Sequence, residues 1–512
     1  MEIVGGLLAH NTVLNLAGQL APLLVGVGAI PFVIRGLGNE RFGLLSLAWV
    51  VLGYFTIFDL GLGRATTKYV SEALGKGDED QVPHIVWTAV TAQVLMGIAG
   101  GAVLVAITPL LAEHVLKVPT GLIKEAKTTF YLLAFSVPVV LVSSSFRGVL
   151  EAMQRFDLVN AINIPSSCAT YILSLVGLAF GFKLPGIVAL ILMARIGAMA
   201  AFAGLSLRIL PKLRGYSGSR TFFPRLFAFG GWITVSSVVG PILVYFDRFL
   251  IGALLSVAAL AFYSAPYEIV SRLSIVPSSL TITLFPAFSM LEGSKDKRSI
   301  ETVFARSLKY VLLTLGPIAI AVGLFAKDGL RLWLGPTFAQ ESTLALKILV
   351  IGGLINALAF TPCALLQAVG RPDLPAKFHL LELPIHIAIA WVLVSNYGIA
   401  GAAIAWTLRV VLDALLLFIA VVRTRKLGAD IFAKNGLTSA IFALLILAGA
   451  AYGIKASAAS FPLLIQCLLL VLAFCLFGWI VWKIVMDVSD KEVIIGLIRR
   501  YGGRPGRSDA RA

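Results

Sequence analysis

The feature that most constrains this chain is a series of long apolar runs separated by short breaks that carry charged residues, proline or glycine. A membrane-spanning helix needs roughly 17–25 mostly apolar residues, and fourteen runs of about that length follow one another along the sequence. They lie near 11–34, 42–62, 84–108, 127–148, 157–182, 185–210, 226–250, 258–286, 308–327, 343–368, 376–396, 399–422, 436–454 and 461–485. Hydrophobic residues make up 59% of the chain and charged residues 13%, whereas soluble domains have roughly 45–50% and about 25%. The sequence therefore predicts an all-α polytopic membrane protein with about 14 transmembrane helices.

Lysine and arginine collect between these apolar runs and give the chain a formal net charge of +16. When the N-terminus is placed inside, the inner segments hold 28 of the basic residues and the outer loops hold 11. Because cytoplasmic loops carry the excess of positive charge in membrane proteins, we expect both termini in the cytoplasm. The charge is thus interpreted as an orientation signal. No nucleic-acid partner is expected, and the basic tail should face membrane lipid headgroups.

A short motif occurs twice in the chain. Residues 150–158 read LEAMQRFDL and residues 366–374 read LQAVGRPDL, with five of nine positions identical and an offset of 216. The copies follow the fourth and the tenth apolar run, so six runs separate them. We therefore predict two six-helix bundles of the same topology, related by a pseudo-two-fold axis along the membrane normal. The expected units are an N-terminal six-helix lobe (1–215), a C-terminal six-helix lobe (216–430), helices 13 and 14 (431–486), and a basic cytoplasmic tail (487–512).

Two stretches carry a resemblance to a known family. Residues 37–78, LGNERFGLLSLAWVVLGYFTIFDLGLGRATTKYVSEALGKGD, resemble the second-span signature of the Wzx-type O-antigen and exopolysaccharide flippases. These form the polysaccharide transporter branch of the multidrug, oligosaccharidyl-lipid and polysaccharide exporter superfamily. Residues 244–269, VYFDRFLIGALLSVAALAFYSAPYEI, are similar to the turn between the seventh and eighth spans of that branch.

The resemblance implies a transporter of the bacterial inner membrane. It would move a polyprenyl-pyrophosphate-linked oligosaccharide from the cytoplasmic to the outer leaflet by alternating access, for the synthesis of a cell-surface polysaccharide. A polysaccharide polymerase and a chain-length regulator are the partners that such a role implies.

Arginine inside an apolar run is the first kind of candidate site residue, because an ionised side chain at mid-bilayer costs on the order of 3 kcal/mol. Arg195 has no acidic residue within a helical turn, so we expect it to bind an anionic ligand or a partner on another helix. Arg409 precedes Asp413 by four residues, which predicts an ion pair on one helix face, with substrate binding by Arg409 as the alternative.

Arg272 follows Glu268 by four residues in the eighth run, which predicts a similar pair. The superfamily resemblance implies that the eighth span lines a central cavity between the lobes. Arg272 is therefore expected to be a cavity cation, which Glu268 releases when a pyrophosphate arrives.

The predicted inner mouth carries a second group of candidates. Its basic residues either capture the pyrophosphate or simply reflect the positive-inside bias. They are Arg64, Lys68, Arg147 and Arg155. Asp59 lies about one helical turn inside this mouth, close enough to Arg64 to hold it in place, so the two residues are expected to form an inner gate.

Titratable residues in the second half of the chain suggest ion coupling. His379, Glu382 and His386 follow one another at steps of three and four, which places them on one side of a helix. Histidine near a carboxylate can carry protons at physiological pH, so the set is either a relay for a coupling ion, H⁺ or Na⁺, or a hydrogen-bonded part of the bundle interior. Asp247 and Arg248, near the outer end of the seventh run, are either a further coupling element or a neutralised pair.

Enzymatic activity is not expected, because the chain has no nucleophile elbow, P-loop or Gly-rich dinucleotide turn, and we expect no cofactor. The cysteines fall inside apolar runs without metal-ligand spacing, so they are expected to be packing residues and no metal site is predicted. They are Cys168, Cys363, Cys467 and Cys475. The alternatives within transport are a multidrug and toxin exporter or a lipid II exporter of the same superfamily. A membrane-embedded glycosyltransferase or polysaccharide polymerase is the alternative from a different class.

Overall fold

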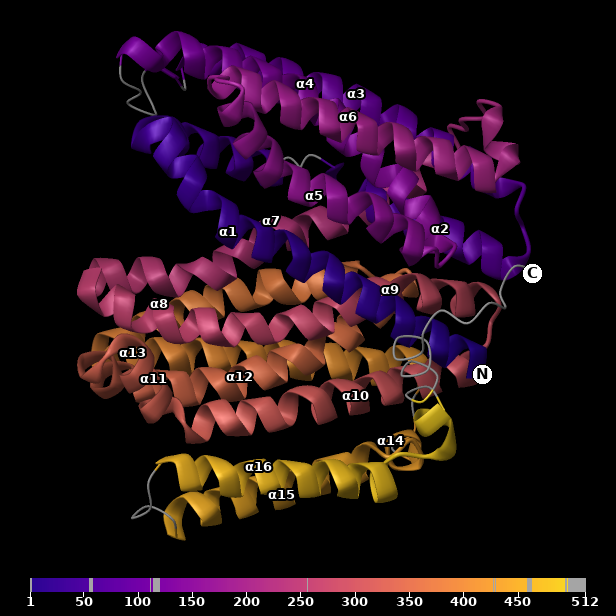
Figure 1. The fold of residues 1–512 in the computed structure, drawn as a ribbon. Coiled ribbons are helices and arrows are strands. Elements are labelled where there is room, and N and C mark those ends of the chain that lie inside the picture. The colour runs from indigo at the N-terminus through magenta and orange to yellow at the C-terminus, as the bar shows by residue number, and fades with distance from the viewer. Residues whose placement is uncertain are drawn as a thin grey trace.

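The computed structural model describes residues 2–54, 59–110, 112–113, 120–255, 257–426, 428, 430–457, 463–492 and 495. In these ranges every regular element is helical (Figure 1). The α-helices are α1 (Glu2–Tyr54), α2 (Leu62–Lys76), α3 (Gln81–Leu110), α4 (Ile123–Ala152), α5 (Phe156–Ala179), α6 (Leu184–Ile209), α7 (Phe223–Leu254), α8 (Val257–Ser271), α9 (Ile275–Gly293), α10 (Lys297–Leu324), α11 (Ala326–Leu334), α12 (Pro336–Ala368), α13 (Asp373–Arg425), α14 (Asp430–Lys434), α15 (Leu437–Ser457) and α16 (Leu463–Ile480).

Eleven helical segments of the described chain are long and apolar enough to cross a membrane. They account for the expected spans from 84–108 onward, two of which, 376–396 and 399–422, fall in the single helix α13. The first expected span lies within α1, and the second begins there. The all-helical polytopic fold class is confirmed, and the total of fourteen spans stays a prediction.

The 53-residue helix α13 bends near its middle. A straight helix of that length would extend about 80 Å at ~1.5 Å per residue, whereas the hydrocarbon core is ~30 Å thick. The bend lies at Gly398, whose φ of 56° and ψ of −136° are not helical, and a positive φ is one that glycine adopts without steric cost. Just beyond it, a Cβ on Gly401 would lie 1.9 Å from the carbonyl oxygen of Leu393. The bend therefore divides α13 into two arms, and the backbones of these arms pack tightly against each other next to the bend.

The helices form two main groups with α1 running diagonally between them (Figure 1). In the N-terminal half, which we define as α1–α6, α3 packs on α4, α4 on α6 and α1 on α5. In the C-terminal half, α7–α13, the closest neighbours are α12 with α13 and α13 with α7. α15 and α16 form a separate pair that packs on α10 (Figure 1).

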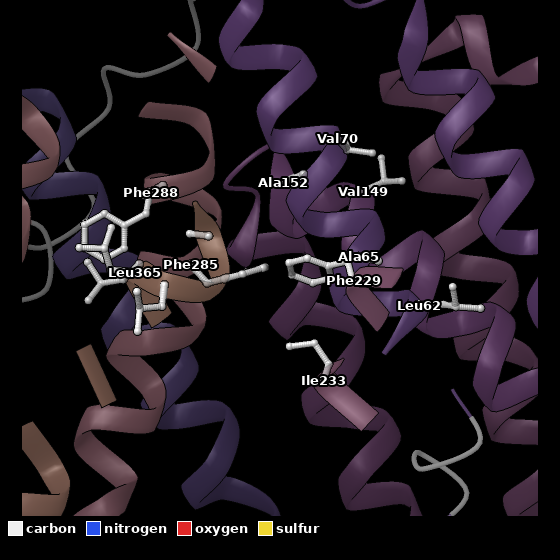
Figure 2. Packing of buried hydrophobic residues seen from close by; sticks show 14 of the residues in the cluster. Leu62, Ala65, Val70, Val149, Ala152, Phe229, Ile233, Phe285, Phe288 and Leu365 are labelled. Carbon is white, nitrogen blue, oxygen red and sulfur yellow. The ribbon is translucent and has the colours of Figure 1, made fainter. Parts of the chain in front are cut away.

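The two halves join through α2, which packs on α9 and α7, and through α1, which also packs on α9. One hydrophobic cluster spans the junction, and Figure 2 shows Ala65 of α2 beside Phe229 of α7, with Phe285 of α9 nearby. Glycine permits a close approach of the two backbones here: a Cβ on Gly61 would lie 2.6 Å from the carbonyl oxygen of Gly230. The halves thus share a buried core at one end of the molecule.

Hydrogen bonds between the halves mark the same end. Asn15 of α1 donates to Thr283 of α9 at 3.1 Å, and Gln19 donates to Ser279 at 2.6 Å. Near the start of α7, Tyr69 donates to the carbonyl oxygen of Arg225. This end contains the start of α1 and the segments 64–76, 147–155 and 295–309, which the sequence places on the cytoplasmic side.

The two copies of the repeated motif fold into the same turn. After α4, the N–H groups of residues 153, 154 and 155 donate to the carbonyl oxygens of residues 149, 151 and 150. After α12, residues 369, 370 and 371 donate to residues 365, 367 and 366 in the same pattern. Gln154 and Gly370 both have positive φ, at 58° and 84°. The offset of 216 residues therefore relates equivalent structural positions.

Ion pairs and hydrogen bonds connect the α15–α16 pair to the C-terminal half at both ends. Near residue 490, the side chains of Lys309 and Tyr310 donate to the Asp490 carboxylate, and Lys309 and Asp490 are fully buried. At the opposite end, Lys455 lies 2.7 Å from Asp328. We expect α15 and α16 to move together with the C-terminal half.

Candidate functional site

Arg64 of α2 connects the two halves. Its Nη1 donates to Oε1 of Gln367 on α12 at 2.6 Å, and its guanidinium lies 5.9 Å from the ring centroid of Phe285 on α9. Since Gln367 is a neutral amide, this contact does not neutralise the arginine. Arg64 is exposed, so its positive charge remains available at the junction.

The expectation that Asp59 holds Arg64 is wrong. The Asp59 carboxylate accepts hydrogen bonds from the backbone N–H of Gly63 at 3.0 Å, from Ser144 at 2.8 Å and from Gln93 at 2.6 Å. The N–H groups in the first turn of a helix have no partner within that helix. Asp59 lies three residues before the start of α2 and accepts a hydrogen bond from one of these groups, the N–H of Gly63, so its contacts stay within its own half.

The other basic residues of the predicted inner mouth each have an acidic partner close in sequence. The Lys68 ammonium binds Glu72 and is almost fully buried. Arg147 lies 3.2 Å from Glu151, and Arg155 lies 2.9 Å from Asp157. Arg371 pairs with Asp373 in the equivalent turn of the second repeat. These pairs leave Arg64 as the inner-mouth candidate without an acidic partner in the described part of the chain.

The pair expected between Glu268 and Arg272 is present, with a separation of 3.3 Å. Glu268 also lies 3.5 Å from Arg248, whose guanidinium stacks 4.5 Å from the ring centroid of Tyr267. The side chains of Glu268 and Arg272 are 53% and 60% exposed. One carboxylate thus faces two arginines, and Arg272 remains open to a ligand.

The titratable residues of α13 meet Asp247 of α7 in a buried network. His386 Nε2 lies 3.1 Å from Asp247 Oδ1, and the Tyr263 hydroxyl donates to Asp247 Oδ2 at 3.4 Å. The side chains of Asp247 and His386 are essentially inaccessible. Arg248 contacts Glu268 instead of its neighbour Asp247, so the neutralised Asp247–Arg248 pair, one of the two alternatives, is not observed among the described residues.

The two arms of α13 supply the rest of this network. Arg409 lies 3.6 Å from Glu382, and His379 lies 4.0 Å from Asp413. The prediction that Arg409 pairs with Asp413 on the same helix face is therefore wrong. In each observed pair, one residue lies before the bend and the other lies at a similar distance after it along the chain. The reason is that the bend at Gly398 folds the second arm back against the first.

The carboxylates of this network are incompletely satisfied. Neither carboxylate oxygen of the fully buried Glu382 has a hydrogen-bond partner among the described residues. The same holds for Asp413 Oδ1, and for Asp247 Oδ1 and His386 Nε2, which lie 3.1 Å apart without forming a hydrogen bond. Unmet buried acceptors are unfavourable unless a proton or cation satisfies them. The described part of the chain contains no group of three or more His, Cys, Asp and Glu side chains able to hold a metal ion.

Arg195 of α6 faces a polar cavity of about 450 Å³ inside the N-terminal half. Its Nε is buried and has no hydrogen-bond partner among the described residues. The cavity is lined by Pro22, Val139, Val140, Ser143, Ser144, Arg147, Asn163, Ser166, Ser167, Thr170, Tyr171, Arg195, Ala198 and Phe202. The structure thus places two of the predicted cations, Arg195 and Arg147, in one cavity.

Sequence reasoning missed the polar wall of that cavity, although a signal for it exists. Asn163, Ser166, Ser167 and Thr170 recur at positions i, i+3, i+4 and i+7 of the apolar helix α5. That spacing places them along one face of a helix. A polar stripe on an otherwise apolar span indicates that this face of the helix borders a hydrated interior rather than lipid.

The sequence profile described as "Polysaccharide biosynthesis protein" matches residues 8–292, and the MatE profile matches residues 233–392. A putative O-antigen transporter of Shigella flexneri is 32% identical over 409 residues, which cover 80% of this chain and 96% of the relative. A probable low-salt glycan biosynthesis flippase of Haloferax volcanii is 23% identical over 194 residues, 37% of this chain and 40% of the relative.

Solved structures support the same fold. An outward-facing multidrug resistance MATE transporter of the MOP superfamily aligns with a TM-score of 0.71 at 14% identity, covering 83% of this chain and 96% of the other. A superfamily transporter from Pyrococcus furiosus, described as having a binding pocket of reverse polarity, aligns with a TM-score of 0.68 at 13% identity and covers 83% and 95%. At these identities the likeness concerns the fold.

Proposed function

Since this chain belongs to the polysaccharide biosynthesis protein family, the polysaccharide transporter branch of the multidrug, oligosaccharidyl-lipid and polysaccharide exporter superfamily, we propose that it is a flippase for a lipid-linked oligosaccharide. The substrate class is a polyprenyl pyrophosphate that carries a short glycan. The direction is from the cytoplasmic to the outer leaflet of the bacterial inner membrane, with both termini in the cytoplasm. A polysaccharide polymerase and a chain-length regulator would use the product.

The names of the relatives support the substrate class. The Shigella relative is a putative O-antigen transporter, and the Haloferax relative is a probable glycan biosynthesis flippase. The first name describes a transporter and the second a flippase. A transporter that does not alter its substrate is therefore favoured over a glycosyltransferase or a polymerase.

The position of the contacts between the halves is the observation that carries the mechanism. Among the described residues, hydrogen bonds between the halves lie at the end that contains the start of α1, as the Asn15–Thr283 and Arg64–Gln367 bonds illustrate. In alternating access, two lobes rock about a substrate site between them. This arrangement supports a state closed toward the cytoplasm, from which the halves separate at this end to admit the next substrate.

Arg272 and Arg64 are proposed as the main contacts of the pyrophosphate. Transfer of a multiply charged group out of water requires fixed charges that replace its hydration. Arg272 is largely exposed and shares Glu268 with Arg248, and Arg64 is bonded to the neutral amide of Gln367. Arg147 and Arg155 are half-exposed and each paired with an acid, so they are assigned to initial capture at the mouth, whereas Lys68 is paired with Glu72 and almost fully buried.

Ion coupling is assigned to the buried network of the C-terminal half. Its three carboxylates, Asp247, Glu382 and Asp413, face one arginine and two histidines, and several of its oxygens lack hydrogen-bond partners among the residues that the structure describes. Histidine is the side chain that titrates near physiological pH. We therefore propose H⁺ as the coupling ion, with uptake by the His386–Asp247 pair altering how α7 packs against α13.

Depletion of the protein in its native cell tests the function. We expect the lipid-linked oligosaccharide to accumulate on the inner leaflet, where a membrane-impermeant periodate oxidant applied to spheroplasts does not reach it. Depletion of a polymerase should instead leave the same lipid accessible to the oxidant. If the inner pool fails to rise, the flippase function is wrong.

A further inference from the structure

The polar cavity lies within the N-terminal half. Every residue that lines it comes from four helices of one half, α1, α4, α5 and α6. Its lining extends along α4 from Val139 to Arg147, about 12 Å at ~1.5 Å per residue. A volume of about 450 Å³ falls within the range of pockets that bind small molecules. The cavity is therefore large enough for a ligand of its own.

The charge of the cavity is positive. Arg195 supplies a guanidinium whose Nε is buried and without a hydrogen-bond partner in the described chain. Arg147 also lines the cavity and is paired with Glu151 at 3.2 Å. Behind the lining residue Ser144 lies Asp59, whose carboxylate is already engaged by Ser144, Gln93 and the Gly63 N–H. An anion in the cavity would thus meet one unpaired cation and a shielded carboxylate.

The uncharged part of the lining is rich in groups that both donate and accept hydrogen bonds. Hydroxyl groups come from α4 and α5, an amide comes from Asn163, and a phenol comes from Tyr171. Hydroxyl and amide side chains provide the donors and acceptors that pair with several hydroxyls on one ligand. The guanidinium fork of arginine matches the oxygens of a phosphate or carboxylate. Together they fit a ligand that joins an oxyanion to a polyol.

We propose that this cavity binds the glycosyl phosphate portion of a lipid-linked glycan, with Arg195 on the oxyanion and the polar stripe of α5 on the sugar. The inference rests on the proposed flippase function and adds a second substrate site, within the N-terminal half, to the cations at the junction. The same chemistry is shared by the phosphate of an ordinary anionic phospholipid, so the test must separate the two sources.

Binding to the purified full-length protein in nanodiscs of neutral lipid provides that test. The probes are farnesyl pyrophosphate linked to N-acetylglucosamine, farnesyl pyrophosphate without sugar, and phosphatidylglycerol. We expect the sugar-bearing probe to bind most tightly and Arg195→Gln to weaken it tenfold or more, because a charge-assisted contact is lost. Arg195→Lys should retain part of the affinity, since it keeps the charge but not the fork.

Two further variants make the result specific to the cavity. Ala198→Phe fills the cavity while Arg195 remains, and should also abolish binding of the sugar-bearing probe. Arg208→Gln removes an exposed arginine of the same helix that does not line the cavity, and should bind like the wild type. A thermal unfolding scan of each variant shows whether it is folded.

Three outcomes would overturn the inference. The site is wrong if folded Arg195→Gln and Ala198→Phe bind the sugar-bearing probe as the wild type does, or if the wild type fails to bind it. The substrate source is wrong if phosphatidylglycerol binds as tightly as the sugar-bearing probe and competes with it. Failure of the flippase function has a different signature: the inner-leaflet pool stays unchanged after depletion, whatever the binding data show.

Discussion

Gly75 of α2 packs directly against the backbone of α9, where a Cβ on it would lie 2.1 Å from the carbonyl oxygen of Met290. The reciprocal position, Gly293 of α9, would place a Cβ 2.4 Å from the carbonyl oxygen of Glu72. The helices therefore cross with backbone against backbone, and no side chain fits between them. This crossing holds the two halves together at the predicted cytoplasmic end.

Gly75→Ala should open that end. At a free helical position the change stabilises a protein by about 1 kcal/mol or less, but here the methyl group must push α2 from α9. We expect a longer distance between spin labels on Lys76→Cys and Ser294→Cys, in a background with the native cysteines replaced, measured by pulsed electron resonance. Gly231→Ala is the matched control, because no atom lies within 4 Å of a Cβ there. An unchanged distance distribution in Gly75→Ala would contradict this account of the closure.

Glu382→Gln should destabilise the protein, because it leaves the Arg409 charge buried without an acidic partner at that position. Loss of one partner of a buried ion pair costs about 3–5 kcal/mol. The double variant Glu382→Leu/Arg409→Met removes both charges and should recover most of the lost thermal stability. Export should stay impaired in the double variant, since the coupling network has lost two of its groups. Equal melting temperatures for Glu382→Gln and the wild type would show that the pair is not a structural unit.

His386→Gln should uncouple transport from the proton gradient. The imidazole lies 3.1 Å from Asp247 and is the group that we propose takes up the proton. In proteoliposomes with an imposed pH gradient, we expect the gradient to accelerate flipping by the wild type and to have no effect on the variant. His84→Gln is the control, because His84 lies exposed in the other half and contacts the Ser217 carbonyl oxygen. A variant that still responds to the gradient would remove His386 from the coupling site.

Arg272→Ala should abolish export while the protein is expressed normally, because the exposed guanidinium is proposed to bind pyrophosphate. Arg272→Lys should retain partial export if charge matters more than bidentate geometry. Surface polysaccharide can be measured by immunoblot of whole cells. Arg298→Ala, at an exposed position in α10, should export normally. Full export by Arg272→Ala would take this residue out of the substrate site.

Asp490→Asn should loosen the α15–α16 pair from α10. Burial would raise the pKa of Asp490, but hydrogen bonds from Lys309 and Tyr310 hold it below its usual value. The ion pair therefore stabilises the fold at neutral pH, and that stability is lost only as the pH falls through the lowered pKa. We expect a clearly reduced melting temperature at pH 7. Asp487→Asn, which affects a pair with Arg306 that is more exposed than the Lys309–Asp490 pair, should change stability by roughly 0–1 kcal/mol. Equal melting temperatures for the two variants would argue against the proposal that Asp490 holds the α15–α16 pair against α10.

Local properties of the sequence predicted much of the fold. The length of the apolar runs anticipated α3–α6 closely, since any helix that crosses the hydrocarbon core must satisfy its backbone internally over a fixed distance. The repeated motif also located equivalent turns, because the same capping pattern with a positive φ at Gln154 and Gly370 depends on a few neighbouring residues.

The partners of the charged residues were predicted less well. Asp59 was expected to bind Arg64 and binds Gly63, Ser144 and Gln93 instead. Arg409 was expected to pair along its own helix and pairs across the bend. In contrast, the Glu268–Arg272 pair formed as expected, since it depends only on spacing along one helix.

By itself, the sequence determined that the chain is a polytopic helical membrane protein and predicted two related halves, because hydropathy and the repeat are properties of consecutive residues. The tertiary structure alone decided which charges meet, and it gathered Arg195 and the polar stripe of α5 into one cavity. The physical reason is that ion pairs and cavities depend on the distance between helices. The bend at Gly398 and the glycine contacts between α2 and α9 set those distances among residues far apart in the chain.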